Sequence, residues 1–148
     1  MADQLVFVNL PVRDLARARA FYAALGFGFD ARFSDESTAC VVVSPSIYLM
    51  LLTRDRFAGF APRPVGSPDR ETTVLVALSR DSREAVDAFM TAGLAAGGTD
   101  NDRLQEHGDV MYGRSISDPD GHVLEPIWMD VARAMPTLPG EMDAAVDA

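Results

Sequence analysis

The segment ISDPDGHVLEPIWMD, residues 116–130, carries a single ionisable side chain, Glu125, inside its predicted strand. An unpaired charge is costly to bury, so this carboxylate needs a partner, a ligand or water. A carboxylate in such a place could act as a general acid or base, or bind a cationic ligand. His122 stands three positions earlier, and an odd spacing on a strand points the two side chains apart. We therefore expect His122 to be a surface residue beside the turn DPDG, which itself predicts only local turn chemistry.

Candidate partners for Glu125 come from the preceding segment HGDVMYGRS, which contains His107, Tyr112 and Arg114. Tyr112 and Arg114 are two apart and so share one face of a strand. Two interpretations stay open. In one, these residues help Glu125 to bind a substrate; in the other, Arg114 and Glu125 form a structural pair with Tyr112 in the core. His107, beside Gly108, is typical of an exposed loop residue.

The elements that must position these residues occur twice along the chain. A shift of 68 positions aligns Val6 with Val74 and Phe21 with Phe89. Each copy begins with a strand, continues with an amphipathic helix and ends with short β-rich runs, which predicts a tandem βαβββ plan of the α+β class. Asp14 is the expected N-cap of the first helix, and Asp81 with Glu84 has the spacing of a capping box in the second.

The repeat also sets the expected domain limits. Residues 1–130 form one domain with halves at about 4–53 and 72–130, joined by a linker, residues 54–71, that is too rich in proline, glycine and charge for a strand. The linker could also be a lid. Residues 131–148 read as an acidic tail.

Strand parity divides the two faces of each predicted sheet. Val6, Val8 and Leu10, with Val74, Val76 and Leu78 of the second copy, should lie beneath the helices. The opposite face then carries the residues expected to line a ligand pocket between the halves, which are Phe7, Asn9, Tyr48, Met50 and Leu75, with Glu125 as its charged member.

Net charge narrows the possible partners. The chain has 13 basic and 22 acidic residues, a total of −9, which argues against nucleic acids and anionic membranes. No run of apolar residues is long enough to span a membrane, so we expect a cytoplasmic protein. Cys40, the only cysteine, lies in the apolar run CVVV and is predicted to be a buried core residue.

The doubled plan, the opening VFVNLPVRDLARARAFYAALGF and the closing DPDGHVLE resemble the vicinal oxygen chelate superfamily of glyoxalases, bleomycin-resistance proteins and extradiol dioxygenases. Within it the likeness is greatest to a small bacterial group described as predicted lactoylglutathione lyases, through FVNLPVRD, YLMLLT, HGDVMYGRS and DGHVLEPIWMD. The resemblance implies a curved, mostly antiparallel half-barrel sheet with helices on its convex face. It also implies a homodimer.

The metal-binding positions of that superfamily are not matched by metal ligands here. Carried over one at a time, the four positions fall on Phe7, near Met50, near Leu75 and on Glu125. Only Glu125 can donate to Zn, Ni or Fe, which need three or four N, O or S donors. We therefore predict no metal ligands, no cofactor and a metal-free pocket for a small molecule.

Three functions follow from this reading. The chain could be a lyase or isomerase with Glu125 as general acid or base, with Phe7, Asn9, Tyr48, Met50, Leu75, His107, Tyr112 and Arg114 as substrate-binding residues. Alternatively, it could be a binding protein that sequesters a cationic or aromatic compound, as the bleomycin-resistance relatives do. Metal-dependent lactoylglutathione lyase is the least favoured, and whether the chain is an enzyme stays open.

Overall fold

A computed structural model describes residues 3–134 of the chain. The first half has the predicted strand–helix–strand order, with a short 3-10 turn, Ala31–Phe33, after its second strand. Its elements are β1 (Val6–Val12), α1 (Leu15–Ala24), β2 (Gly28–Phe29), β3 (Thr38–Ser44) and β4 (Ile47–Thr53). The segment predicted as a linker begins with a short helix, α2 (Arg54–Ala58), and then runs without regular structure to the second half.

The second half repeats the order of the first half, with a longer second strand. Its elements are β5 (Leu75–Ser79), α3 (Arg83–Ala95), β6 (Thr99–His107), β7 (Met111–Ser117) and β8 (Val123–Met129). A short helix, α4 (Val131–Ala134), begins the predicted tail, and residues 135–148 of that tail lie outside the described residues. Among residues 3–134, no helix is both long and apolar enough to cross a membrane.

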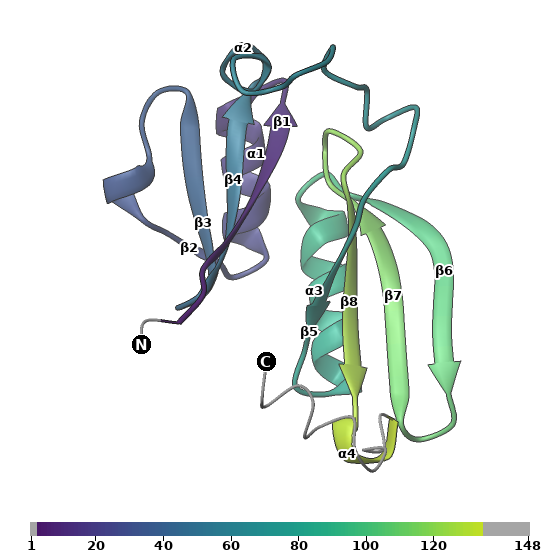
Figure 1. The fold of residues 1–148 in the computed structure, drawn as a ribbon. Coiled ribbons are helices and arrows are strands. Elements are labelled where there is room, and N and C mark those ends of the chain that lie inside the picture. The colour runs from purple at the N-terminus through teal and green to yellow at the C-terminus, as the bar shows by residue number, and fades with distance from the viewer. Residues whose placement is uncertain (1–2, 135–148) are drawn as a thin grey trace.

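The tandem α+β plan is confirmed, with one difference from the expected single sheet. The strands form two separate four-stranded sheets, ordered β1-β4-β3-β2 and β5-β8-β7-β6 (Figure 1). In each sheet the first strand pairs in parallel with the last, and the remaining pairs are antiparallel. The parallel pairs arise because each helix carries the chain from the first strand to the far side of its sheet before the strands return.

Local sequence signals explain where the helices begin. The Asp14 side chain accepts a hydrogen bond from the backbone N–H of Arg17 and is the N-cap of α1, as predicted. The N-cap of α3 is Ser82, which accepts from the backbone N–H of Ala85, so the predicted cap at Asp81 is wrong by one residue. A serine hydroxyl can accept a hydrogen bond from the same free backbone N–H groups as an aspartate carboxylate. Either residue can therefore cap the helix, and the prediction differs from the structure only in which of the two is the N-cap.

The core confirms the predicted parity of the strands. Leu10 and Leu78 are buried beneath the helices, and Val8 and Val76 pack against the same cluster. Val6 and Val74 were predicted on the same face but are 47% and 57% exposed, so the prediction is wrong for these two residues. Val6 begins β1 and Val74 precedes β5, and neither belongs to the core cluster. Cys40 is fully buried, as expected. The two halves share one hydrophobic core, to which both helices contribute through Phe21, Tyr22, Phe89 and Met90.

The DPDG turn joins the two halves by polar contacts that sequence reasoning did not foresee. The Tyr22 hydroxyl of α1 donates to Asp118 Oδ2 at 2.8 Å, and the backbone N–H of Arg13 donates to Asp120 Oδ1 at 2.8 Å. His122 Nε2 lies 2.7 Å from the carbonyl oxygen of Pro11, which can only accept, so the imidazole donates. The expectation that His122 is a surface residue is therefore wrong, and the turn is more than local.

Candidate functional site

Glu125 lies on the sheet face that turns away from the helices. Its neighbours Leu124 and Pro126 are buried, whereas Glu125 is half-buried and pairs in register with Ala77 of β5. Leu75 lies on the same face, two residues before Ala77. The structure thus places Glu125 and Leu75 on the sheet face on which the sequence predicted them.

A hollow of about 780 Å³ covers this face of the second sheet. Glu125 and Leu75 line it together with small polar side chains from β6 and β7 and with part of the segment that joins the halves. These further lining residues include Thr99, Asn101, Arg103, Gln105, Ser115, Ser117, Asp69, Arg70 and Thr72. The hollow is therefore a polar site with one half-buried carboxylate in its wall.

A hydrogen-bonded row of three side chains lies in this wall. Asn101 Nδ2 donates to Ser115 Oγ at 2.9 Å, and Ser117 Oγ donates to Asn101 Oδ1 at 3.0 Å. The Asn101 amide is thus fixed from both sides, and Ser115, 3% exposed, is almost fully buried. Sequence reasoning missed this row. The signal that could have found it is the alternation of Ser115 and Ser117 in the segment GRSIS, which parity places on the face of Glu125.

Tyr112 and Arg114 lie on the opposite face of the sheet. The Tyr112 hydroxyl donates to Asp87 Oδ1 of α3 at 2.6 Å, and Arg114 donates to Asp87 at 3.1 Å and to Asp100 at 2.9 Å. The Tyr112 hydroxyl, with smaller help from Arg114, lowers the pKa of Asp87 below its usual value. Both predicted pairings with Glu125 are therefore wrong, because the strand register turns these two side chains toward the helix.

His107 is the last residue of β6 and is exposed, as expected for its place beside Gly108. It does not line the hollow that contains Glu125. Among the sequence-predicted partners, none of His107, Tyr112 and Arg114 reaches this carboxylate within the described part of the chain.

The other predicted pocket residues lie on the first sheet. Phe7 and Tyr48 stack with ring centroids 5.0 Å apart, and Asn9 pairs in register with Met50 on the neighbouring strand. Their common face matches the prediction, but these four residues do not line the hollow around Glu125. The predicted single pocket is therefore divided between two sheets within one chain.

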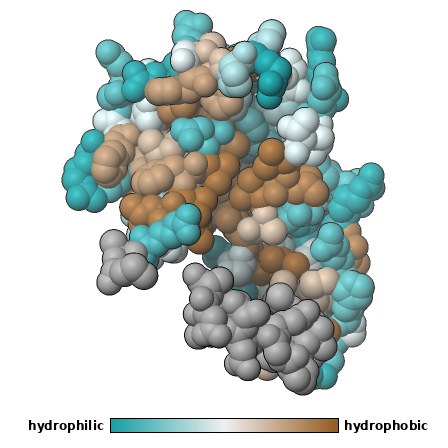
Figure 2. All heavy atoms as spheres, in the orientation of Figure 1, coloured by the Kyte–Doolittle hydropathy of each residue, from teal (hydrophilic) through white to brown (hydrophobic). Residues whose placement is uncertain are grey.

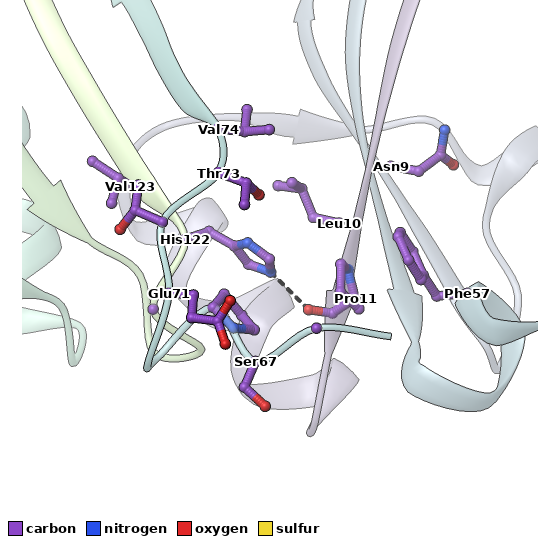
Figure 3. Close-up of a pocket in the computed structure, with 14 residues that line it drawn as sticks. Asn9, Leu10, Pro11, Phe57, Ser67, Glu71, Thr73, Val74, His122 and Val123 are labelled. Atoms are coloured by element: carbon purple, nitrogen blue, oxygen red, sulfur yellow. Dashed lines mark hydrogen bonds between the residues drawn. The ribbon is translucent and has the colours of Figure 1, made fainter. Parts of the chain in front are cut away.

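A second, smaller cleft of about 210 Å³ lies between the halves (Figure 3). Asn9 and Pro11 of β1, Phe57 of α2 and His122 line it, and the segment from Gly66 to Val74 runs along its side. The close-up shows the His122 imidazole directed at the Pro11 carbonyl (Figure 3). The segment predicted as a linker or lid thus forms a wall of both hollows.

The donor set does not suit a metal ion. Phe7, Met50 and Leu75 stand where ligands would be needed, and they offer a ring, a thioether and an alkyl chain in place of imidazole or carboxylate. Within residues 3–134 no three His, Cys, Asp or Glu side chains are grouped closely enough to hold an ion. Glu125 alone cannot supply the coordination sphere of a metal ion.

The chain is similar to known proteins in its N-terminal segment and in its fold. Residues 4–44 match the model of the bleomycin resistance protein-like N-terminal family. No curated protein matches the sequence.

Solved structures similar to this one carry names of the same kind. A glyoxalase/bleomycin resistance protein from Albidiferax ferrireducens is 25% identical, with 82% of this chain and 95% of that chain covered and a TM-score of 0.63. A glyoxalase-related enzyme from Fulvimarina pelagi is 20% identical, with coverages of 88% and 91% and a TM-score of 0.74. A bleomycin resistance determinant encoded on the transposon Tn5 is 22% identical, with coverages of 87% and 99% and a TM-score of 0.59.

Proposed function

We propose that the chain, whose fold and N-terminal segment are similar to those of glyoxalase and bleomycin-resistance proteins, binds a small molecule through Glu125 without a metal ion. The observation that carries this proposal is the state of Glu125. This carboxylate is half-buried in a hollow of about 780 Å³ and has no hydrogen-bond or ion-pair partner among residues 3–134. A ligand that donates to it would satisfy a group that the protein leaves free.

Binding is favoured over catalysis because the groups expected to assist Glu125 lie elsewhere. General acid–base chemistry gains most from a second titratable group or an oriented donor near the reacting atoms. Tyr112 and Arg114 are bonded to Asp87 on the helix side instead. Glu125 has no cationic partner within residues 3–134, and a cationic ligand would supply one, so the proposed activity is sequestration of a cationic compound.

One observation supports the alternative, a lyase or isomerase with Glu125 as general acid or base. The row Asn101–Ser115–Ser117 lines the same hollow as Glu125, and the Ser115 hydroxyl has no acceptor among the described residues. A substrate oxygen held by Ser115 would lie near a carboxylate able to take or give a proton. Turnover of a bound ligand, abolished in Glu125→Gln, would establish this alternative.

In this proposal a second copy of the chain completes the pocket. Phe7 and Leu75 are 42% and 56% exposed on faces that no element of residues 3–134 covers, and Leu5, Val6 and Val74 are exposed as well. Figure 2 shows apolar side chains gathered in the middle of this face of the molecule, where the two sheets lie next to each other in Figure 1. Exposed apolar patches of this kind favour burial against a partner. We expect a dimer by light scattering, converted to monomer by Phe7→Asp; a wild-type monomer at high micromolar concentration would reject the arrangement.

The proposal is tested by titration with phenethylamine, a protonated aromatic amine, and with the uncharged phenylethanol of similar shape. Wild-type protein should bind the amine at least tenfold more tightly than the alcohol, because only the amine carries a charge for Glu125. Glu125→Gln should remove this preference, whereas the exposed Glu36→Gln, on the first half, should retain it. Equal binding of amine and alcohol by the wild type, or an unchanged preference in Glu125→Gln, would reject the proposal. Added chelator should leave the affinity unchanged.

A further inference from the structure

We infer that the ligand is amphoteric, with a cationic group held by Glu125 and an anionic group held by Arg103 in the same hollow. The inference rests on the proposed function, because it names the chemical class of the molecule that would bind there. The observation behind it is an irregularity in β6. A site for a simple cation would not require this irregularity.

The irregularity is a bulge opposite Ser115. Asp100 pairs with Ile116 and Leu104 pairs with Arg114, so three residues of β6 stand opposite one residue of β7. Asp102, at the centre of the bulge, has a φ of 53° and is the one non-glycine residue with positive φ in the described part of the chain. A left-handed conformation is unfavourable for an L-residue, and strands that bulge in this way re-aim the side chains beside them.

The side chains on either side of Asp102 are turned to the hollow. Asn101 and Arg103 both line it. Ser115 and Ser117 fix the Asn101 amide by hydrogen bonds of 2.9 and 3.0 Å, and the backbone N–H of Asp102 donates to Asp100 Oδ1 at 2.9 Å. These hydrogen bonds hold the bulge at Asn101 and at Asp102. They fix the direction in which Arg103 leaves the strand.

The guanidinium of Arg103 is free to bind. Within residues 3–134, neither Arg103 nor Arg70, which lines the same hollow, has a carboxylate partner. Arg114 on the other face of the sheet shows the contrast, because it bridges Asp87 and Asp100. Arg70 and Arg103 thus bring two cations without carboxylate partners to a hollow whose wall also contains Glu125, Asp69 and Asp118. A guanidinium matches the geometry of a carboxylate or phosphate.

Charges of both signs in one hollow favour a ligand that carries both over one that carries either alone. A purely anionic ligand would be repelled by Glu125, and a purely cationic one would leave both guanidiniums without a partner. A molecule with an ammonium or guanidinium at one end and a carboxylate or phosphate at the other satisfies both sets. Arg103 therefore acts as a specificity-determining residue, and the row Asn101–Ser115–Ser117 positions it through the bulge.

The test uses ω-aminocarboxylates of graded chain length, with the alkylamine and the alkanoate of each length as partial probes, titrated into the full chain. At the length that spans the hollow, the amino acid should bind about tenfold more tightly than the amine alone, with the advantage reduced in high salt. Arg103→Gln should abolish this advantage and leave amine binding unchanged. The matched control Arg63→Gln, an exposed arginine of the joining segment outside this hollow, should retain it.

The two proposals fail in different ways. If amino acid and amine bind equally at every length, or if Arg103→Gln leaves the advantage intact, the amphoteric ligand is rejected while cation binding at Glu125 stands. If amine binding does not depend on Glu125, the proposed function is rejected, and the inference with it.

Discussion

Replacing Tyr22 by phenylalanine removes one atom from the contact that joins the two halves. The Tyr22 side chain is fully buried, and its hydroxyl donates to Asp118 Oδ2 at 2.8 Å. Asp118 is 3% exposed, so water cannot replace the lost donor. Leaving a buried carboxylate oxygen without this bond costs about 2 kcal/mol. For a domain of this length, the loss corresponds to a decrease in Tm of roughly 4–8 °C.

The assay is denaturant unfolding at two pH values, with Tyr48→Phe as the control. The Tyr48 hydroxyl donates to the Pro45 carbonyl at an exposed site, so its loss should cost less than about 0.5 kcal/mol. Burial raises the pKa of Asp118, so its charged form costs stability at neutral pH and the group becomes more favourable as the pH falls. A protonated carboxyl needs the Tyr22 donor less, and the deficit of Tyr22→Phe should shrink in mildly acidic buffer. Equal effects of the two phenylalanine variants, or a deficit that grows on acidification, would refute this reasoning.

Two further predictions concern packing and charge. Gly93→Ala would place a Cβ 2.5 Å from Ile116 Cδ1 and 3.3 Å from Leu25 Cδ2, both in the buried core. This overpacking should outweigh the gain in helix propensity within α3, so the free energy of unfolding should fall by about 1 kcal/mol. Gly66→Ala, with open space around the added carbon, should not have this packing cost; similar values for the two variants from denaturant unfolding would contradict the packing. Tyr112→Phe should raise the pKa of Asp87 in an NMR titration, because the hydroxyl is the main cause of its lowering, and an unchanged pKa would mean that this hydrogen bond is absent in solution.

Strand parity made much of the fold predictable from the sequence. The period of two fixed which residues lie beneath the helices, so Leu10 and Leu78 were assigned to the core and Glu125 to the opposite face. The 68-residue repeat fixed the order of elements in both halves. These signals are local or periodic, and no tertiary contact was needed to read them.

The predictions that failed depended on register between distant segments. Parity showed that Tyr112 and Arg114 share a face, but it did not show which of the two faces. The pairing of β7 with β8 places both side chains on the face toward the helix. His122 lies beside Pro11, 111 positions earlier in the chain, a contact that no local pattern encodes. The division of the predicted pocket between two sheets has the same cause, because the sequence repeat says how each half folds and not how the two faces meet.

The most direct test of the central claim is where a protonated amine binds. Phenethylamine titrated into isotopically labelled protein should shift the NMR signals of Ser115, Ser117 and Glu125, and should give no such shifts in Glu125→Gln. Shifts confined to the cleft around Pro11 and Phe57, or the same shifts without the carboxylate, would contradict the account.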